Sequence, residues 1–328
     1  MNNMKIKAIA ESAMGAAVCA LLMITSLYVP FFSGIAAIVS GIPIMCLFYK
    51  NNITSGILAF VCAFLITFIL TGDIVSVGVM AFLYVAPAVV FGIFNSKGNK
   101  FSASVAAAAV VTLIGVVIEF NMLNGSGTGI RDFVTSYSNN IQSMLSETMA
   151  ASGVDMGEDM SGAVTRVINQ AIDMIMYYLP TIIICIAVFY AYLVAMVGAF
   201  VLKRLRIKEV QHAPFNTLVA PKYVCHITVI LFVLTYIIKA SGVYSAALKN
   251  VLLVSEIFLG ICGFAFLDLK FSKVLRQWYI RLIIYIGIWF SVFMLLPFLG
   301  EILVLVGFFR SLFQNNSHDS FGGEKYGD

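Results

Sequence analysis

Apolar residues in this chain are gathered into long blocks that are separated by short polar connections. Five apolar segments come first, over residues 9–31, 34–49, 53–71, 74–94 and 102–120. Four more follow a polar interval, over residues 179–202, 223–238, 250–267 and 279–296. An apolar run of about 20 residues is long enough to cross the hydrocarbon core of a bilayer as a helix. The pattern therefore predicts an all-α polytopic membrane protein, a helical bundle of about nine transmembrane helices.

The C-terminal end of this pattern is open to two interpretations. Residues 298–313 form a further apolar piece directly after Pro297. Its length fits either a short tenth crossing or a helix that lies in the membrane interface. The sequence therefore leaves open on which side of the membrane the C-terminus lies. The final residues, 314–328, are polar and contain glycine, and we expect them to form a disordered tail.

Residues 121–178 form the only long polar interval within the apolar part of the chain. Apolar side chains recur every four residues from Phe133 to Met149, and again at helical spacing from Met160 to Ile175. Asp159 or Ser161 is a suitable N-cap for the second of these helices, which runs into the next membrane segment. We expect an amphipathic helical hairpin. It is either an interfacial helix pair without a ligand or a lid over a cavity.

The basic residues indicate how the chain is oriented. With the N-terminus in the cytoplasm, fourteen of the 20 Lys and Arg residues fall in inner loops and four in outer loops, and two are unassigned. Inner loops of membrane proteins are rich in Lys and Arg. The predicted order is therefore transmembrane helices 1–5 over residues 1–120, an extracytoplasmic helical insertion over 121–178, and helices 6–9 with a short apolar helix over 179–313. We expect a multi-pass protein of the plasma membrane.

Composition supports the lipid bilayer as the main partner. The hydrophobic fraction is 61% and the charged fraction 11%, whereas soluble domains have about 45–50% apolar and about 25% charged residues. The net charge of +4 comes from basic residues in short loops, not from one basic face, so we do not expect nucleic-acid binding. The six cysteines lie in or beside apolar segments without a CxxC pair, which favours packing over a disulfide framework or a zinc site.

Motifs of enzymes are missing from the sequence. It contains no HExxH, no GxSxG and no P-loop, and its three histidines are scattered. We therefore expect neither an enzyme nor a cofactor or metal site. Glu256 is the best ligand-binding candidate because ionisable residues at membrane depth are costly. Lys239 or Lys249 could pair with it, and the alternative is a structural ion pair or a protonated carboxyl group.

Small residues recur on the first apolar helix. Ala16 and Ala20 belong to one row, and Ala13 and Ala17 to the neighbouring row. Such rows let two helix backbones approach closely in lipid. They serve either packing within this chain or the docking of a partner subunit, and the spacing alone does not separate the two.

Several short motifs resemble those of the YybS-like family of bacterial integral membrane proteins, a domain of unknown function. The motifs are Leu179-Pro180, Pro214-Phe215 with Pro221, residues 250–254, Gly260 with Gly263, and residues 305–307. This resemblance extends over most of the chain. It implies a membrane protein and no particular activity.

The first six helices also resemble the membrane substrate-binding subunits of energy-coupling-factor transporters. Ala13 with Ala17, and Ala16 with Ala20, match the small-residue rows that dock the coupling subunit of that family. The segment that begins at Tyr28 matches the ligand-covering connection by position. The resemblance implies a small ligand near the outer face and a membrane coupling subunit with an ATPase supplied in trans. Two functions thus stay open: a small-ligand-binding, transporter-associated component, or a non-enzymatic scaffold without a ligand.

Overall fold

The computed structural model describes most of the chain as helices. It covers residues 2–125, short pieces between 135 and 147, and residues 158–211, 214–237, 243–275, 277–290 and 298–313. No strand occurs over these ranges, which agrees with the all-α prediction. The chain divides into two compact units, residues 1–212 (unit 1) and residues 213–328 (unit 2), and each is described by itself.

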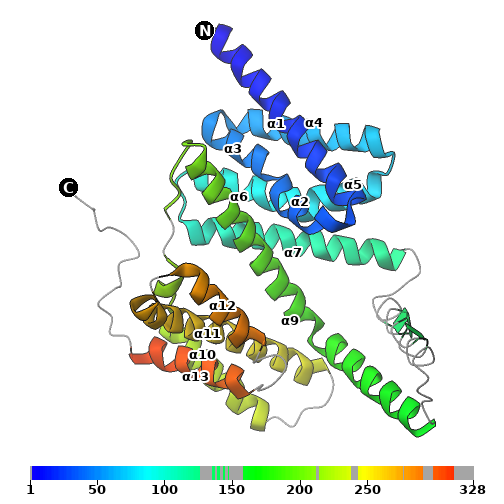
Figure 1. Cartoon of the computed structure of the whole chain (residues 1–328), viewed down its shortest axis with the longest axis vertical. Coiled ribbons are helices and arrows are strands. Elements are labelled where there is room, and N and C mark those ends of the chain that lie inside the picture. The colour runs from blue at the N-terminus through cyan, green and yellow to red at the C-terminus, as the bar shows by residue number, and fades with distance from the viewer. Residues whose placement is uncertain are drawn as a thin grey trace. The chain divides into compact units, whose positions relative to one another are not determined.

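Unit 1 contains the first five apolar segments and the long helix that follows the polar interval (Figure 1). Four of its six spans are single helices, and two are interrupted by a turn or a π-helix. The elements are α1 (Asn2–Tyr28), η1 (Pro30–Phe32), α2 (Ser33–Ser40), α3 (Ile42–Lys50), α4 (Ile53–Thr71), α5 (Ile74–Met80), η2 (Ala81–Val85), α6 (Ala86–Ser96), α7 (Phe101–Gly125) and α9 (Glu158–Arg204).

Unit 2 is built from shorter helices around one long one. Its elements are η3 (Phe215–Thr217), α10 (Lys222–Ile237), α11 (Val243–Val274), α12 (Trp278–Phe290) and α13 (Phe298–Phe313). A small core forms where α10, α11 and α13 meet, around Cys225, Leu259 and Cys262. Phe308 of α13 packs against this core.

Seven helical segments of the described chain are long and apolar enough to cross a membrane. Six lie in unit 1, and the seventh is Tyr244–Val274 in unit 2. The predicted crossing at 223–238 is the shorter helix α10, and the one at 279–296 is described only as far as α12 extends. The all-α architecture with several helices suited to crossing a membrane is therefore confirmed, whereas the number nine stays a prediction.

The helices extend beyond the apolar segments that reveal them in the sequence. α7 continues to Gly125, and α11 covers 32 residues where the apolar run predicts 250–267. Hydrophobicity marks the part of a helix that lies in lipid, and the same helix continues into water when its polar residues permit it. α9 likewise runs without a break from Glu158 through Pro180, so the second amphipathic helix and the membrane span form one element.

Most of the first helix of the predicted hairpin lies outside the described residues, as do Lys239, residues 291–297 and the C-terminal tail. The hairpin and its place outside the membrane therefore stay predictions. Where α9 is described before Pro180, Val167 and Met174 are exposed and Ile172 is half-buried.

Two clusters of buried residues hold unit 1 together, and α3 contributes to both. Ile44 and Phe48 pack with α1, α4 and α6, while Met45 packs with α6, α7 and α9. Gly198 of α9 lies directly against Met45, since a Cβ at that glycine would be 2.2 Å from the Met45 methyl carbon. Lipid gives no hydrophobic driving force between membrane helices, so such close contacts supply the packing energy.

The break between α2 and α3 is caused by Gly41 and Pro43. Proline has no backbone N–H and favours the first turn of a helix, where α3 places it. At Gly41 a Cβ would lie 2.5 Å from the Cβ of Ala88 and 3.0 Å from the carbonyl oxygen of Val85. The break therefore lies directly against the interrupted span that contains α5, η2 and α6.

We expect Gly41→Ala to destabilise the protein by about 1–3 kcal/mol, because the new methyl group would overpack this contact. The measurement is the apparent melting temperature of the purified protein in detergent. Gly34→Ala is the matched control, since a Cβ there meets nothing within 4 Å. Equal melting temperatures for the two variants would contradict the close contact at Gly41.

Candidate functional site

Tyr190 of α9 connects the two interrupted spans of unit 1. Its hydroxyl lies 3.1 Å from the carbonyl oxygen of Ala37 in α2 and 3.2 Å from the carbonyl oxygen of Tyr84 in η2. Both carbonyl groups belong to backbone where the regular helix is disturbed. The two positions are 47 residues apart in the chain, and this single side chain bridges them.

The disturbed end of α2 explains why the Ala37 carbonyl group is open to side-chain donors. In a regular helix the N–H of Gly41 would donate to the carbonyl oxygen of Ala37. Here it donates to the carbonyl oxygen of Val39, so the Ala37 oxygen loses that donor. The hydroxyl of Ser40 also donates to that oxygen, at 2.8 Å. In η2 the backbone hydrogen bonds have π-helix geometry, and the N–H of Ala86 donates to the carbonyl oxygen of Ala81. Single π turns inside helices often occur at functional sites.

The Tyr190 hydroxyl has one proton to share between two acceptors. Neutral O–H···O bonds are usually about 2.7–2.8 Å long, whereas these two contacts are 3.1 and 3.2 Å. Neither carbonyl group therefore receives a short hydrogen bond from Tyr190, although that of Ala37 also accepts one from Ser40. At membrane depth an underpaired backbone carbonyl is costly, and it is tolerated where it lines a protein-enclosed site.

The ring of Tyr84 lies beside Tyr190 and is also near an acidic residue. The rings of Tyr84 and Tyr190 pack edge to face with centroids 5.6 Å apart. Glu119, near the end of α7, lies close enough for its charge to act on the Tyr84 phenol. Gly115 lets α7 approach the π-helix, because a Cβ there would be 3.1 Å from the Cα of Leu83. We call Ala37, Tyr84, Glu119 and Tyr190 the Tyr190 cluster.

Of the predicted ligand residues, Tyr28 alone belongs to unit 1. Tyr28 is the last residue of α1 and is 62% exposed, and its hydroxyl forms no hydrogen bond with the described residues. Lys239 lies outside the described residues. Glu256 is on α11 in unit 2. No ligand role of these three residues is tested by the structure.

Glu256 has an acidic neighbour where the sequence suggested a basic one. The charge of Glu301 on α13 acts on the Glu256 carboxyl group. Glu256 forms no ion pair with the described residues, although Lys249 lies about two turns before it on the same helix.

The two alanine rows of α1 have different surroundings. Ala16 and Ala20 are 1% and 2% exposed and pack within unit 1. Ala13 and Ala17 are exposed, next to the exposed side chains of Met14 and Val18. Only the row of Ala13 and Ala17 is therefore open to a partner, and docking by that row stays a prediction.

The basic loop after α9 folds back onto the end of α3. Ile207 and Val210 pack against the core, and Lys208 lies 5.5 Å from the ring centroid of Tyr49. The Tyr49 hydroxyl donates to Asn95 at 2.7 Å. Lys203 pairs with Glu209 at 2.5 Å, which lowers the pKa of that carboxyl group. A groove of about 520 Å³ between Tyr49 and this loop carries Lys50 and Arg206.

Sequence reasoning missed Tyr84, Glu119 and Tyr190 as a group. The available signal was a pair of apolar segments interrupted by glycine or proline, at Gly41 with Pro43 and at Pro87. In membrane transporters such interruptions mark the places where backbone groups line a binding site. The tyrosine that joins the two interruptions comes from a third helix, and nothing in its local sequence announces that role.

Comparison with known protein families places the chain in one of them. A family model with the description "predicted membrane protein (DUF2232)" matches residues 17–308, which include unit 1 except its first 16 residues and most of unit 2. Comparisons with curated proteins and with solved structures give no match. The energy-coupling-factor resemblance of the first six helices is therefore not shown. The apolar helices and the match over most of its length agree: the chain belongs to the DUF2232 family of membrane proteins.

Proposed function

We propose that this protein is a multi-pass plasma-membrane component that binds a small ligand in unit 1 for a transport system. The observation that carries the proposal is the Tyr190 hydroxyl shared between two interrupted spans. Interrupted membrane helices expose backbone carbonyl groups, and transporters use such groups to hold substrates and ions. The six apolar spans of unit 1 supply the frame around them.

The chemistry of the Tyr190 cluster favours a ligand that donates hydrogen bonds. Two carbonyl oxygens are acceptors, and the Tyr190 hydroxyl is the shared donor. A ligand with N–H groups could take over the acceptors that Tyr190 serves poorly. The aromatic rings of Tyr84 and Tyr190 would attract a cationic group.

The energy for transport would come from another chain. The sequence has no P-loop, so ATP hydrolysis requires an ATPase supplied in trans. The exposed row of Ala13 and Ala17 is the face on which a membrane coupling subunit would dock. With the N-terminus in the cytoplasm, the start of α1 lies on the same side as such an ATPase.

Purification in mild detergent tests the proposal. We expect a small molecule to remain bound in native mass spectrometry and an ATPase activity to remain attached. Ala17→Leu should reduce the attached activity about tenfold, since overpacking costs about 1–3 kcal/mol. Ala106→Leu, at an exposed position of α7, is the matched control. A preparation with neither small molecule nor ATPase would favour the scaffold function.

A further inference from the structure

Helices α11 and α13 run parallel to each other through a close glycine contact. A Cβ at Gly263 would lie 2.0 Å from the carbonyl oxygen of Leu303 and 3.1 Å from the nitrogen of Gly307. Further along both helices, Phe266 meets Arg310. Residue numbers thus rise together on the two helices. Their C-terminal ends, with Lys270 and Arg310, therefore lie at the same face of the bundle.

Phe266 carries two cations at this end. The guanidinium carbon of Arg310 lies 5.3 Å from the ring centroid, and the amino nitrogen of Lys270 also lies 5.3 Å from it. Neither side chain forms an ion pair with the described residues. The nearby Asp268 is engaged by Arg281 at 3.1 Å. The positive charges of Lys270 and Arg310 repel each other, because both lie over the same ring. A bound anion would neutralise this repulsion.

Arg310 also has unused hydrogen-bonding capacity. One of its terminal nitrogens donates to the carbonyl oxygen of Asn216 at 3.0 Å, while the other, Nη1, is buried without a partner. An unpaired buried N–H of a charged group is costly, and a guanidinium group suits the two oxygens of a phosphate. The missing partner therefore has the chemistry of a phosphate or carboxylate group.

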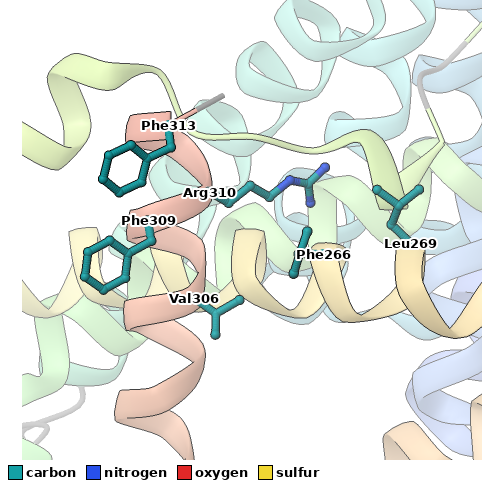
Figure 2. A pocket seen from close by; sticks show the side chains of 6 residues that line it. All are labelled: Phe266, Leu269, Val306, Phe309, Arg310 and Phe313. Carbon is teal, nitrogen blue, oxygen red and sulfur yellow. The ribbon is translucent and has the colours of Figure 1, made fainter. Parts of the chain in front are cut away.

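An apolar groove of about 550 Å³ adjoins this cationic place (Figure 2). Arg310 is the one charged residue among those that line it, and it reaches from α13 toward Phe266 and Leu269. Phe309 and Phe313 stack with centroids 6.0 Å apart and are 51% and 77% exposed. A charged head beside an exposed apolar surface matches a lipid with an anionic headgroup.

We propose that α11 and α13 bind one anionic phospholipid, with its phosphate between Arg310 and Lys270 and an acyl chain over Phe309 and Phe313. The lipid supplies the negative charge that the two cations lack and covers the exposed rings. Basic places between membrane helices at the cytoplasmic side recognise such headgroups. By the positive-inside orientation the lipid belongs to the inner leaflet. This inference concerns unit 2 and does not depend on the ligand of unit 1.

The test uses the full chain purified in detergent and titrated with phosphatidylglycerol, with phosphatidylcholine of the same acyl chains, and with inorganic phosphate. Bound lipid is counted by native mass spectrometry, and the melting temperature is followed in parallel. We expect phosphatidylglycerol to be retained and to raise the melting temperature. Lys270→Gln should weaken its binding roughly fivefold, and Arg310→Gln more strongly. Lys273→Gln, an equal loss of charge one turn away, should have little effect.

The outcomes separate this lipid site from simpler explanations. Equal retention of phosphatidylcholine would overturn the proposal, because the groove would then bind acyl chains without reading the headgroup. Full protection by inorganic phosphate alone would overturn it in favour of a free-anion site. If Arg310→Gln does not fold, the exposed Lys270 decides, and equal losses in Lys270→Gln and Lys273→Gln would reject the site.

Discussion

Replacing Gly263 by alanine is expected to separate α13 from α11 and to cost about 3 kcal/mol or more, the upper end of what overpacking usually costs. The added Cβ would lie 2.0 Å from the carbonyl oxygen of Leu303 and 2.9 Å from its carbonyl carbon. These are backbone atoms, so no side-chain rotation relieves the clash. Gly307→Ala should have the same effect, since its Cβ would lie 1.9 Å from the carbonyl oxygen of Leu259.

The measurement is the fraction of monodisperse protein after size-exclusion chromatography in detergent, together with its melting temperature. Gly260→Ala is the matched control on the same helix, because its Cβ would meet Val304 at an ordinary 3.6 Å. We expect Gly260→Ala to match the parent protein. A Gly263→Ala variant that is equally stable would show that the two helices do not meet at these glycines.

The same glycine contact bears on the C-terminal topology. α11 is long and apolar enough to cross the membrane, and α13 packs along it in the same direction. A helix that lay flat in the interface could not follow a spanning helix from Leu259 to Phe266. The contact is therefore the basis for a prediction that α13 crosses the membrane and does not lie in the interface. It also predicts that the C-terminus lies on the same side as the end of α11.

Hydrophobicity was sufficient to predict the membrane class and the approximate place of the spans. The span 53–71 coincides with α4, because Gly72, with φ of 71°, ends the helix where the apolar run ends. Helix ends beyond the lipid were not predictable in this way, as α7 and α11 show. Their polar residues continue the helix, and an apolar pattern carries no information about that part.

The contacts between side chains of different helices could not be predicted from the sequence. The rows of Ala13 with Ala17 and of Ala16 with Ala20 look alike, and which row is buried depends on where α3 and α4 pack. Glu256 stands out in its segment, but its neighbour Glu301 is contributed by a helix whose place the sequence left open. Contacts of this kind depend on packing between distant segments, which periodicity along one helix does not encode.

Tyr190→Phe is expected to lower stability by about 1–3 kcal/mol, because it removes the donor that two buried carbonyl groups share. The ring and its contact with Tyr84 remain, so the loss reports on the hydroxyl alone. The melting temperature in detergent measures it. Tyr192→Phe is the matched control on α9, since its ring packs on Phe101 and its hydroxyl has no hydrogen-bond partner in the described residues.

The same variant separates a structural hydroxyl from a ligand site. If Tyr190 only ties the two interrupted spans together, Tyr190→Phe melts earlier but keeps the small molecule that co-purifies with the parent protein. If the Tyr190 cluster binds that molecule, its retention falls at temperatures where the variant is still folded, and adding the molecule back restores less of the lost stability. A folded Tyr190→Phe protein with unchanged retention would move the ligand of unit 1 away from the interrupted spans.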